Sequence, residues 1–131
     1  MVFAANAHAE RSGPRLPQPP FFPSRAPRGM GEYLNASFGG EMVVIGSAFG
    51  TADPLLKIAN AADGTFDAEL QEVRGVPFAL DLRRGREGSA AAWLSSWHSP
   101  RSANENSEVV LATAFDAVVF FPLVSGVKKV D

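Results

Sequence analysis

The side chains that could carry chemistry are two histidines, two tryptophans and scattered serines and carboxylates. His98 lies beside Ser96 and Ser99, but a hydrolytic triad needs a nucleophile, a base and an orienting acid that converge in space. Adjacency in the sequence does not provide this. His8 lies close to the start of the chain and is interpreted as a solvated residue. Cysteine is absent, which excludes a thiol nucleophile, a thiolate metal site and a disulfide.

Two further patterns resemble binding motifs but lack essential members. A strand-like segment runs into a loop at residues 46–50, GSAFG, which lacks both the G-x-G-x-x-G dinucleotide pattern and the Gly-Lys-Ser/Thr of a P-loop. Its glycines are therefore read as turn residues. Asp63, Asp67 and Glu69 lack the order and the terminal glutamate of a calcium loop. We expect no catalytic residue, no metal or other cofactor, and no enzyme activity.

The two tryptophans offer a different kind of site. Trp93 and Trp97 lie four residues apart in SAAAWLSSWH, so they share a face in a helix and in a strand alike. Two neighbouring indoles could stack on sugar rings, although tryptophan also dominates core packing. This pair supports one hypothesis, a β-sandwich module that binds carbohydrate or another small ligand.

Residues 1–31 are expected to form an extended N-terminal arm, and residues 32–131 a single globular domain. Proline recurs at every third position from Pro14 to Pro23, the turn length of a polyproline II helix. The alternative is a disordered linker, but the apolar Leu16, Phe21 and Phe22 favour docking on a surface. The residues predicted to bind a partner are Arg11, Pro14, Arg15, Leu16, Pro17, Pro20, Phe21, Phe22, Pro23, Arg25 and Arg28.

The net charge also differs between the predicted arm and the rest of the chain. The segment from Glu10 to Gly31 carries four arginines and one glutamate, a net charge of +3, which leaves −5 for the rest of a chain whose total is −2. Four dispersed arginines are too few to predict specific nucleic-acid contact. Residues 1–9 end in Ala7-His8-Ala9 like an export-signal cleavage site, but they lack the apolar stretch of a signal. The cellular compartment is left undetermined.

The most apolar run, EVVLATAFDAVVFFPLV at residues 108–124, must lie in the core. It is shorter than the roughly 20 apolar residues of a membrane span, so membrane insertion is not expected. Its valines and phenylalanines favour a strand covered on both faces, with a turn or bulge at Asp116 and an end to pairing at Pro122.

The turn residues and alternating patterns in the rest of the chain predict many short strands. Strands are expected at 32–38, 41–45, 66–71, 76–83 and 123–130, with a hairpin turn at Arg74-Gly75. Asp53, Pro54 and Gly64 predict a helix at 53–64, and residues 89–97 fit either state. These elements indicate a mainly β fold, a β-sandwich or jelly-roll-like barrel with one or two short helices. The alternative is a small α+β fold.

The first functional hypothesis follows from the arm and the missing chemistry. It is a non-enzymatic structural subunit of a viral particle or another multi-subunit complex, whose arm docks on a neighbouring subunit. Its partners would be protein subunits, in a homo- or hetero-oligomer.

Overall fold

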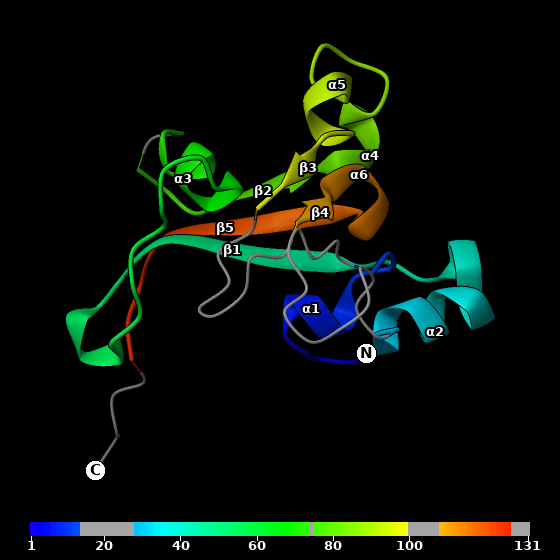
Figure 1. Cartoon of the computed structure of the whole chain (residues 1–131), viewed down its shortest axis with the longest axis horizontal. Coiled ribbons are helices and arrows are strands. Elements are labelled where there is room, and N and C mark those ends of the chain that lie inside the picture. Colours follow the sequence, from blue (N-terminus) through cyan, green and yellow to red (C-terminus); the bar gives the residue numbers. More distant parts are fainter. Residues whose placement is uncertain (14–27, 74, 100–107, 127–131) are drawn as a thin grey trace, which may run out of the picture.

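The structure, a computed structural model, describes residues 1–13, 28–73, 75–99 and 108–126 (Figure 1). These residues form six α-helices and five strands in two small sheets, a small α+β architecture. The helices are α1 (Asn6–Ala9), α2 (Met30–Phe38), α3 (Phe66–Gln71), α4 (Leu82–Gly85), α5 (Ala91–Leu94) and α6 (Leu111–Ala114), with 3-10 turns at Gly39–Glu41 and Pro54–Leu56. The strands are β1 (Ile45–Ala52), β2 (Phe78–Asp81), β3 (Trp97–His98), β4 (Val109–Val110) and β5 (Ala117–Val124).

The larger sheet has the order β1-β5-β2, so the last strand of the chain lies in the middle. β1 runs parallel to β5, and β2 runs antiparallel to it. α1 and α2 lie beside the free edge of β1, whereas α4, α5 and α6 lie beyond β5 (Figure 1). β3 and β4 form a separate antiparallel pair.

The prediction of a β-sandwich or jelly-roll-like barrel is therefore wrong, and the alternative of a small α+β fold is correct. Two segments predicted as strands, 32–38 and 66–71, lie in α2 and α3. The predicted hairpin is also absent from the described residues, because β2 pairs with β5 instead.

Residues at the two ends of α2 determine where this helix begins and stops. The Glu32 carboxylate accepts a hydrogen bond from the Gly29 amide at 3.1 Å, which satisfies a donor that the first turn leaves open. Gly39 takes a φ of 48°, a left-handed conformation that suits glycine and stops the helix.

α3 shows why alternation over six residues is a weak signal. Phe66 and Leu70 are both buried, and they are four residues apart, so they share a helical face as well as a strand face. The deciding feature is Thr65, whose hydroxyl accepts a hydrogen bond from the Ala68 amide at 3.3 Å and caps the helix.

The predicted helix at 53–64 begins where expected and ends early. The Asp53 carboxylate accepts a hydrogen bond from the Leu55 amide at 2.9 Å, and Pro54 occupies the first position. Only the 3-10 turn Pro54–Leu56 forms, because Lys57 adopts a left-handed φ of 52°. The glycines at 46 and 50, read as turn residues, lie inside β1. A Cβ on Gly46 would lie 3.0 Å from the ring of Phe115, so close packing explains that glycine.

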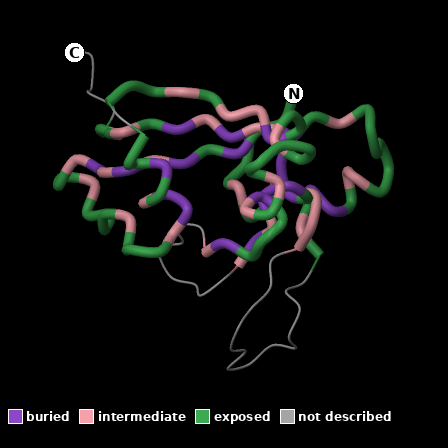
Figure 2. The backbone as a smooth tube through the Cα atoms, turned by 90° about the horizontal axis from the view of Figure 1, so that it is seen from above, coloured by how far each residue is buried: buried purple, intermediate pink, exposed green. Residues whose placement is uncertain are grey.

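The core lies on one face of the larger sheet. Buried and more exposed positions alternate along β1 (Figure 2), and Val118 and Phe120 on β5 are buried on the same side. Phe120, Leu82 and Leu111 are the largest fully buried side chains. Phe121 and Leu123 on β5 are exposed on the opposite face, so β5 is not covered on both faces as predicted. Among the described helices, none combines the length and apolar character that crossing a bilayer requires.

The central run is a strand only in part. Its first residues form β4 and α6, and β5 begins after Asp116. Pro122 does not end the pairing, because Leu123 and Val124 still pair with Thr51 and Ala52. β2 pairs with β5 only as far as Phe120, so Pro122 lies where β5 has a single neighbour, a position where proline is tolerated.

Candidate functional site

α1 is fixed to the sheet by a side chain that imitates a strand. The side-chain amide of Asn6 donates a hydrogen bond to the Ser47 carbonyl at 2.6 Å and accepts one from the Ser47 amide at 3.0 Å. Both bonds lie on the free edge of β1, where unpaired backbone groups would otherwise need water. This four-residue helix is too short to hold itself together, so the edge of β1 holds it in place.

A second clamp follows directly after α1. The Arg11 guanidinium donates to both oxygens of Asp116, at 2.9 Å for Oδ1, and also donates to the Met42 carbonyl. The Arg11 amide donates to the Ala114 carbonyl at 3.1 Å. Asp116 additionally accepts the Val44 amide at 2.8 Å, so this carboxylate joins the N-terminal segment, the entry to β1 and the start of β5.

The charge of Asp116 is stabilised in this setting. Burial raises the pKa of Asp116, but the hydrogen bonds from Arg11 and Val44 and the positive charges of Arg11 and Arg83 outweigh that effect. The resulting pKa lies below the ordinary value of 3.8.

Two buried carboxyl groups face each other where α1 meets α2. Glu10 and Glu32 are each only 6% exposed. Glu32 has partners in the Gly29 amide and in Arg28, whose Nε lies 3.9 Å away, whereas Oε1 of Glu10 has no hydrogen-bond partner. Burial, and secondarily the charge of Glu32, raises the pKa of Glu10 to about 8. Glu10 therefore keeps its proton at neutral pH.

α1 and α2 approach so closely that Gly31 cannot carry a side chain without movement. A Cβ at Gly31 would lie 2.2 Å from the Ala9 carbonyl oxygen and 2.3 Å from that of Glu10. Backbone atoms cannot swing aside as a flexible side chain can, so α1 would have to shift.

We expect Gly31→Ala to lower the free energy of unfolding by about 1 to 3 kcal/mol, the usual range for overpacking. This sign is informative, because alanine in a helix ordinarily stabilises relative to glycine. Gly40→Ala is the control, since a Cβ there would meet nothing within 4 Å. Urea denaturation of both variants measures the difference. A Gly31→Ala variant as stable as Gly40→Ala would contradict the close contact.

The two histidines have opposite surroundings. His98 is buried, its Nε2 lies 2.6 Å from the Trp93 carbonyl, and its ring centroid lies 4.3 Å from that of Trp93. A carbonyl can only accept, so Nε2 of His98 carries a proton and is committed to that bond. His8 lies on α1 and is exposed. Of these two described histidines, His8 alone presents its imidazole to solvent.

The predicted tryptophan platform is divided by the structure. Trp93 is half-buried on α5 and its indole donates to the Glu69 carboxylate at 2.8 Å. Trp97 on β3 is 45% exposed. One indole is thus engaged by a neighbouring helix and by His98. Ligand binding by the pair stays a prediction.

Most of the predicted partner-binding arm lies outside the described residues. This applies to Pro14, Arg15, Leu16, Pro17, Pro20, Phe21, Phe22, Pro23 and Arg25. Arg11 is bound within the chain by Asp116, and Arg28 lies over the ring of Tyr33 at 5.1 Å. The division into an arm and a domain likewise stays a prediction.

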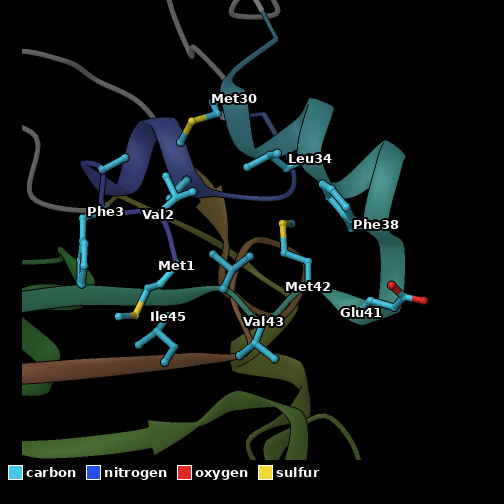
Figure 3. Close-up of a pocket in the computed structure, with 13 residues that line it drawn as sticks. Met1, Val2, Phe3, Met30, Leu34, Phe38, Glu41, Met42, Val43 and Ile45 are labelled. Carbon is cyan, nitrogen blue, oxygen red and sulfur yellow. The ribbon is translucent and has the colours of Figure 1, made fainter.

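An apolar groove of about 430 Å³ opens beside α1. Its walls come from residues 1–4, from α2 and from the entry to β1 (Figure 3). Leu34 and Phe38 on α2 line it together with Met42, whose side chain points up toward α2 (Figure 3). Ala9, the last residue of α1, and Ala4, which precedes α1, also line it, so the groove adjoins the helix that carries His8.

The comparisons with known proteins decide the family. The family model named erythromycin esterase matches residues 1–124, nearly the whole chain. The chain belongs to the erythromycin esterase family. No curated protein matches it.

Two solved structures share the fold with this erythromycin esterase family chain. A Bacillus cereus protein aligns with a TM-score of 0.67 at 20% identity over 92% of the chain. A succinoglycan biosynthesis protein aligns with a TM-score of 0.66 at 18% identity over the same share. The chain spans 32% of the length of each structure.

Family membership corrects the functional prediction. The expectation that the chain is not an enzyme is wrong, because the family is one of esterases by name. Neither the family nor the two structures support a structural subunit of an assembly. Sequence reasoning also passed over Asn6, Glu10 and Glu32. Asp116 carried a usable signal, since a lone aspartate inside an apolar run must find a partner.

Proposed function

We propose that this chain takes part in ester hydrolysis, with His8 as the general base. The exposed imidazole of His8, on a helix fixed at both ends, is the observation that carries the proposal. Asn6 anchors the helix to β1 on one side, and Arg11 anchors it to Asp116 on the other. A base held on a rigid support is what positioned proton transfer requires.

The reaction step follows from the chemistry of the neutral imidazole. His8 takes a proton from a water molecule as that water attacks the ester carbonyl carbon. The tetrahedral intermediate collapses with cleavage of the bond to the alkoxy oxygen, and the proton passes from the imidazolium to the departing alkoxide. The products are a carboxylic acid and an alcohol, and the imidazole returns to its starting state.

The groove suggests the substrate class. Its lining is mostly apolar and adjoins α1, so it suits the apolar part of an ester. The family name points to a macrolide lactone such as erythromycin, which is a cyclic ester. The chain spans 32% of the length of each matched structure.

We expect His8→Gln to reduce ester hydrolysis by about 100- to 10,000-fold, the usual contribution of a general base. Erythromycin and a p-nitrophenyl ester serve as substrates. Mass spectrometry follows the gain of one water when the lactone opens, and absorbance follows the release of p-nitrophenolate. Ala7→Gln is the matched control, because it places the same side chain at the neighbouring exposed position and leaves His8 intact. Unchanged turnover by His8→Gln, or no hydrolysis of either ester by the natural chain, would contradict the proposal.

A further inference from the structure

Glu10 is an unusual residue to bury in a contact between two helices. It is 6% exposed, and its Oε1 has no hydrogen-bond partner. A buried, ionised carboxylate without a partner is strongly unfavourable, because it loses its hydration and gains nothing in return. The position is acceptable only while the carboxyl group is neutral.

The charged and titratable groups around Glu10 offer it no positive partner among the described residues. β1, which packs against α1, contains no ionisable side chain. α2 contributes Glu32, which is itself acidic, and the exposed Tyr33, which lies under Arg28. Within the N-terminal segment, Arg11 is bound to Asp116 and the Met42 carbonyl, and His8 is exposed.

Arg28 does not neutralise Glu10 either. Its Nε lies 3.9 Å from Glu32 Oε1, so this ion pair belongs to the other carboxylate. Glu10 is buried at this contact, where a Cβ on Gly31 would lie 2.3 Å from the Glu10 carbonyl oxygen. Ionisation of Glu10 and contact between α1 and α2 therefore oppose each other.

We propose that Glu10 is a positioning residue that holds α1, and with it His8, against α2 through its uncharged carboxyl group, and that loss of its proton detaches α1. This inference rests on the proposed function insofar as it concerns His8. Its physical part, the detachment of α1, stands on the contact alone. The chain would then carry an alkaline limit on its own activity.

The raised pKa of Glu10 determines whether the contact between α1 and α2 weakens in acid or in alkali. The pKa of Glu10 is raised from 4.5 to about 8 in the folded chain, chiefly by burial. A raised pKa gives a contribution that is full below pH 4.5 and is lost as pH rises through 8. Detachment is therefore an alkaline event.

Amide hydrogen exchange over residues 1–13 of the full chain tests the detachment without any need for activity. The bonds to follow are Ala9 N–H to the Ala5 carbonyl, Glu10 N–H to the Asn6 carbonyl and Arg11 N–H to the Ala114 carbonyl. Protection corrected for intrinsic exchange should fall by about 10-fold or more between pH 6.5 and pH 9.5 in the natural chain. Glu10→Gln, which imitates the neutral acid, should keep its protection over that range.

The control is Glu87→Gln, the same substitution at an exposed glutamate, which should lose protection as the natural chain does. If Glu10→Gln does not fold, Glu32→Gln carries the test. It removes the charge that opposes ionisation of Glu10, so the alkaline loss of protection should be smaller. Equal losses in the natural chain and in the Glu10→Gln or Glu32→Gln variant, or no loss in the natural chain, would overturn the inference.

The pH dependence of ester hydrolysis provides a second test, which measures activity. kcat/KM should fall above about pH 8 in the natural chain and stay level in Glu10→Gln. If Glu10 had a purely structural role, Glu10→Gln would lower kcat/KM by the same factor at every pH. The shape of its pH profile would then match that of the natural chain. The expected alkaline loss of amide protection, found without any ester hydrolysis, would reject the esterase proposal alone. Ester hydrolysis with amide protection that does not depend on pH would reject the role of Glu10 alone.

Discussion

Replacing Phe120 with alanine should lower the free energy of unfolding by about 3 to 5 kcal/mol. Phe120 is fully buried on the central strand β5, and its ring centroid lies 5.2 Å from that of Phe78 on β2. Truncation removes the transfer energy of the ring and leaves a cavity between β5 and the helices that cover it. Urea denaturation followed by circular dichroism gives the value.

The neighbouring residue supplies a matched control. Phe121 is 40% exposed on the opposite face of the same strand. Phe121→Ala removes the same atoms from the same strand, so its cost should be well below that of Phe120→Ala. Equal losses at the two positions would mean that the two faces of the sheet are buried alike, contrary to the architecture described above.

Asp116→Ala is expected to cost about 3 to 5 kcal/mol, because it breaks a buried ion pair by removing one partner. The Val44 amide would lose its acceptor, and the Arg11 guanidinium would lose both carboxylate oxygens and keep only the Met42 carbonyl. Asp116→Asn keeps an acceptor for Val44 and should lose less. Thermal and urea denaturation of the two variants measure the order.

The loss of stability in acid measures the contribution of the Asp116 charge, because Asp116→Asn keeps the shape of the side chain without the charge. The pKa of Asp116 is lowered, so its contribution is present above pH 3.8 and is lost as pH falls through the lowered pKa. The natural chain should therefore lose stability in acid more steeply than Asp116→Asn. Arg83→Gln removes an exposed pair with Asp81 and should leave the free energy of unfolding almost unchanged. A larger loss in Arg83→Gln than in Asp116→Ala would refute this ranking.

Local signals in the sequence predicted where some elements begin, but not the type or the extent of most of them. Asp53 and Pro54 begin a helical turn as expected, and residues 78–81 form the middle of a predicted strand. What local signals did not reveal is where an element stops or which period a short pattern follows. Lys57 ends one helix through its backbone conformation alone, and Phe66 and Leu70 fit two periods at once.

The candidate site was beyond sequence reasoning for a different reason. His8 reads as a loose terminal residue until Asn6 is seen bonded to Ser47, 41 positions further along the chain. Arg11 reads as part of a basic arm until it meets Asp116, 105 positions away. Each of these meanings depends on a contact between distant segments, and a single sequence holds no record of such contacts.

The central place of β5 also sets the order in which the chain can fold. β1 and β2 each pair with β5, and neither pairs with the other. Within the described part of the chain, the larger sheet therefore has no strand pairing until residues 117–124 are present. The anchor of Arg11 on Asp116 has to wait for the same segment. During synthesis β1 therefore lacks its partner strand β5 until residues 117–124 have left the ribosome. Such long-range topology slows folding and lengthens the time in which the nascent chain needs protection from aggregation.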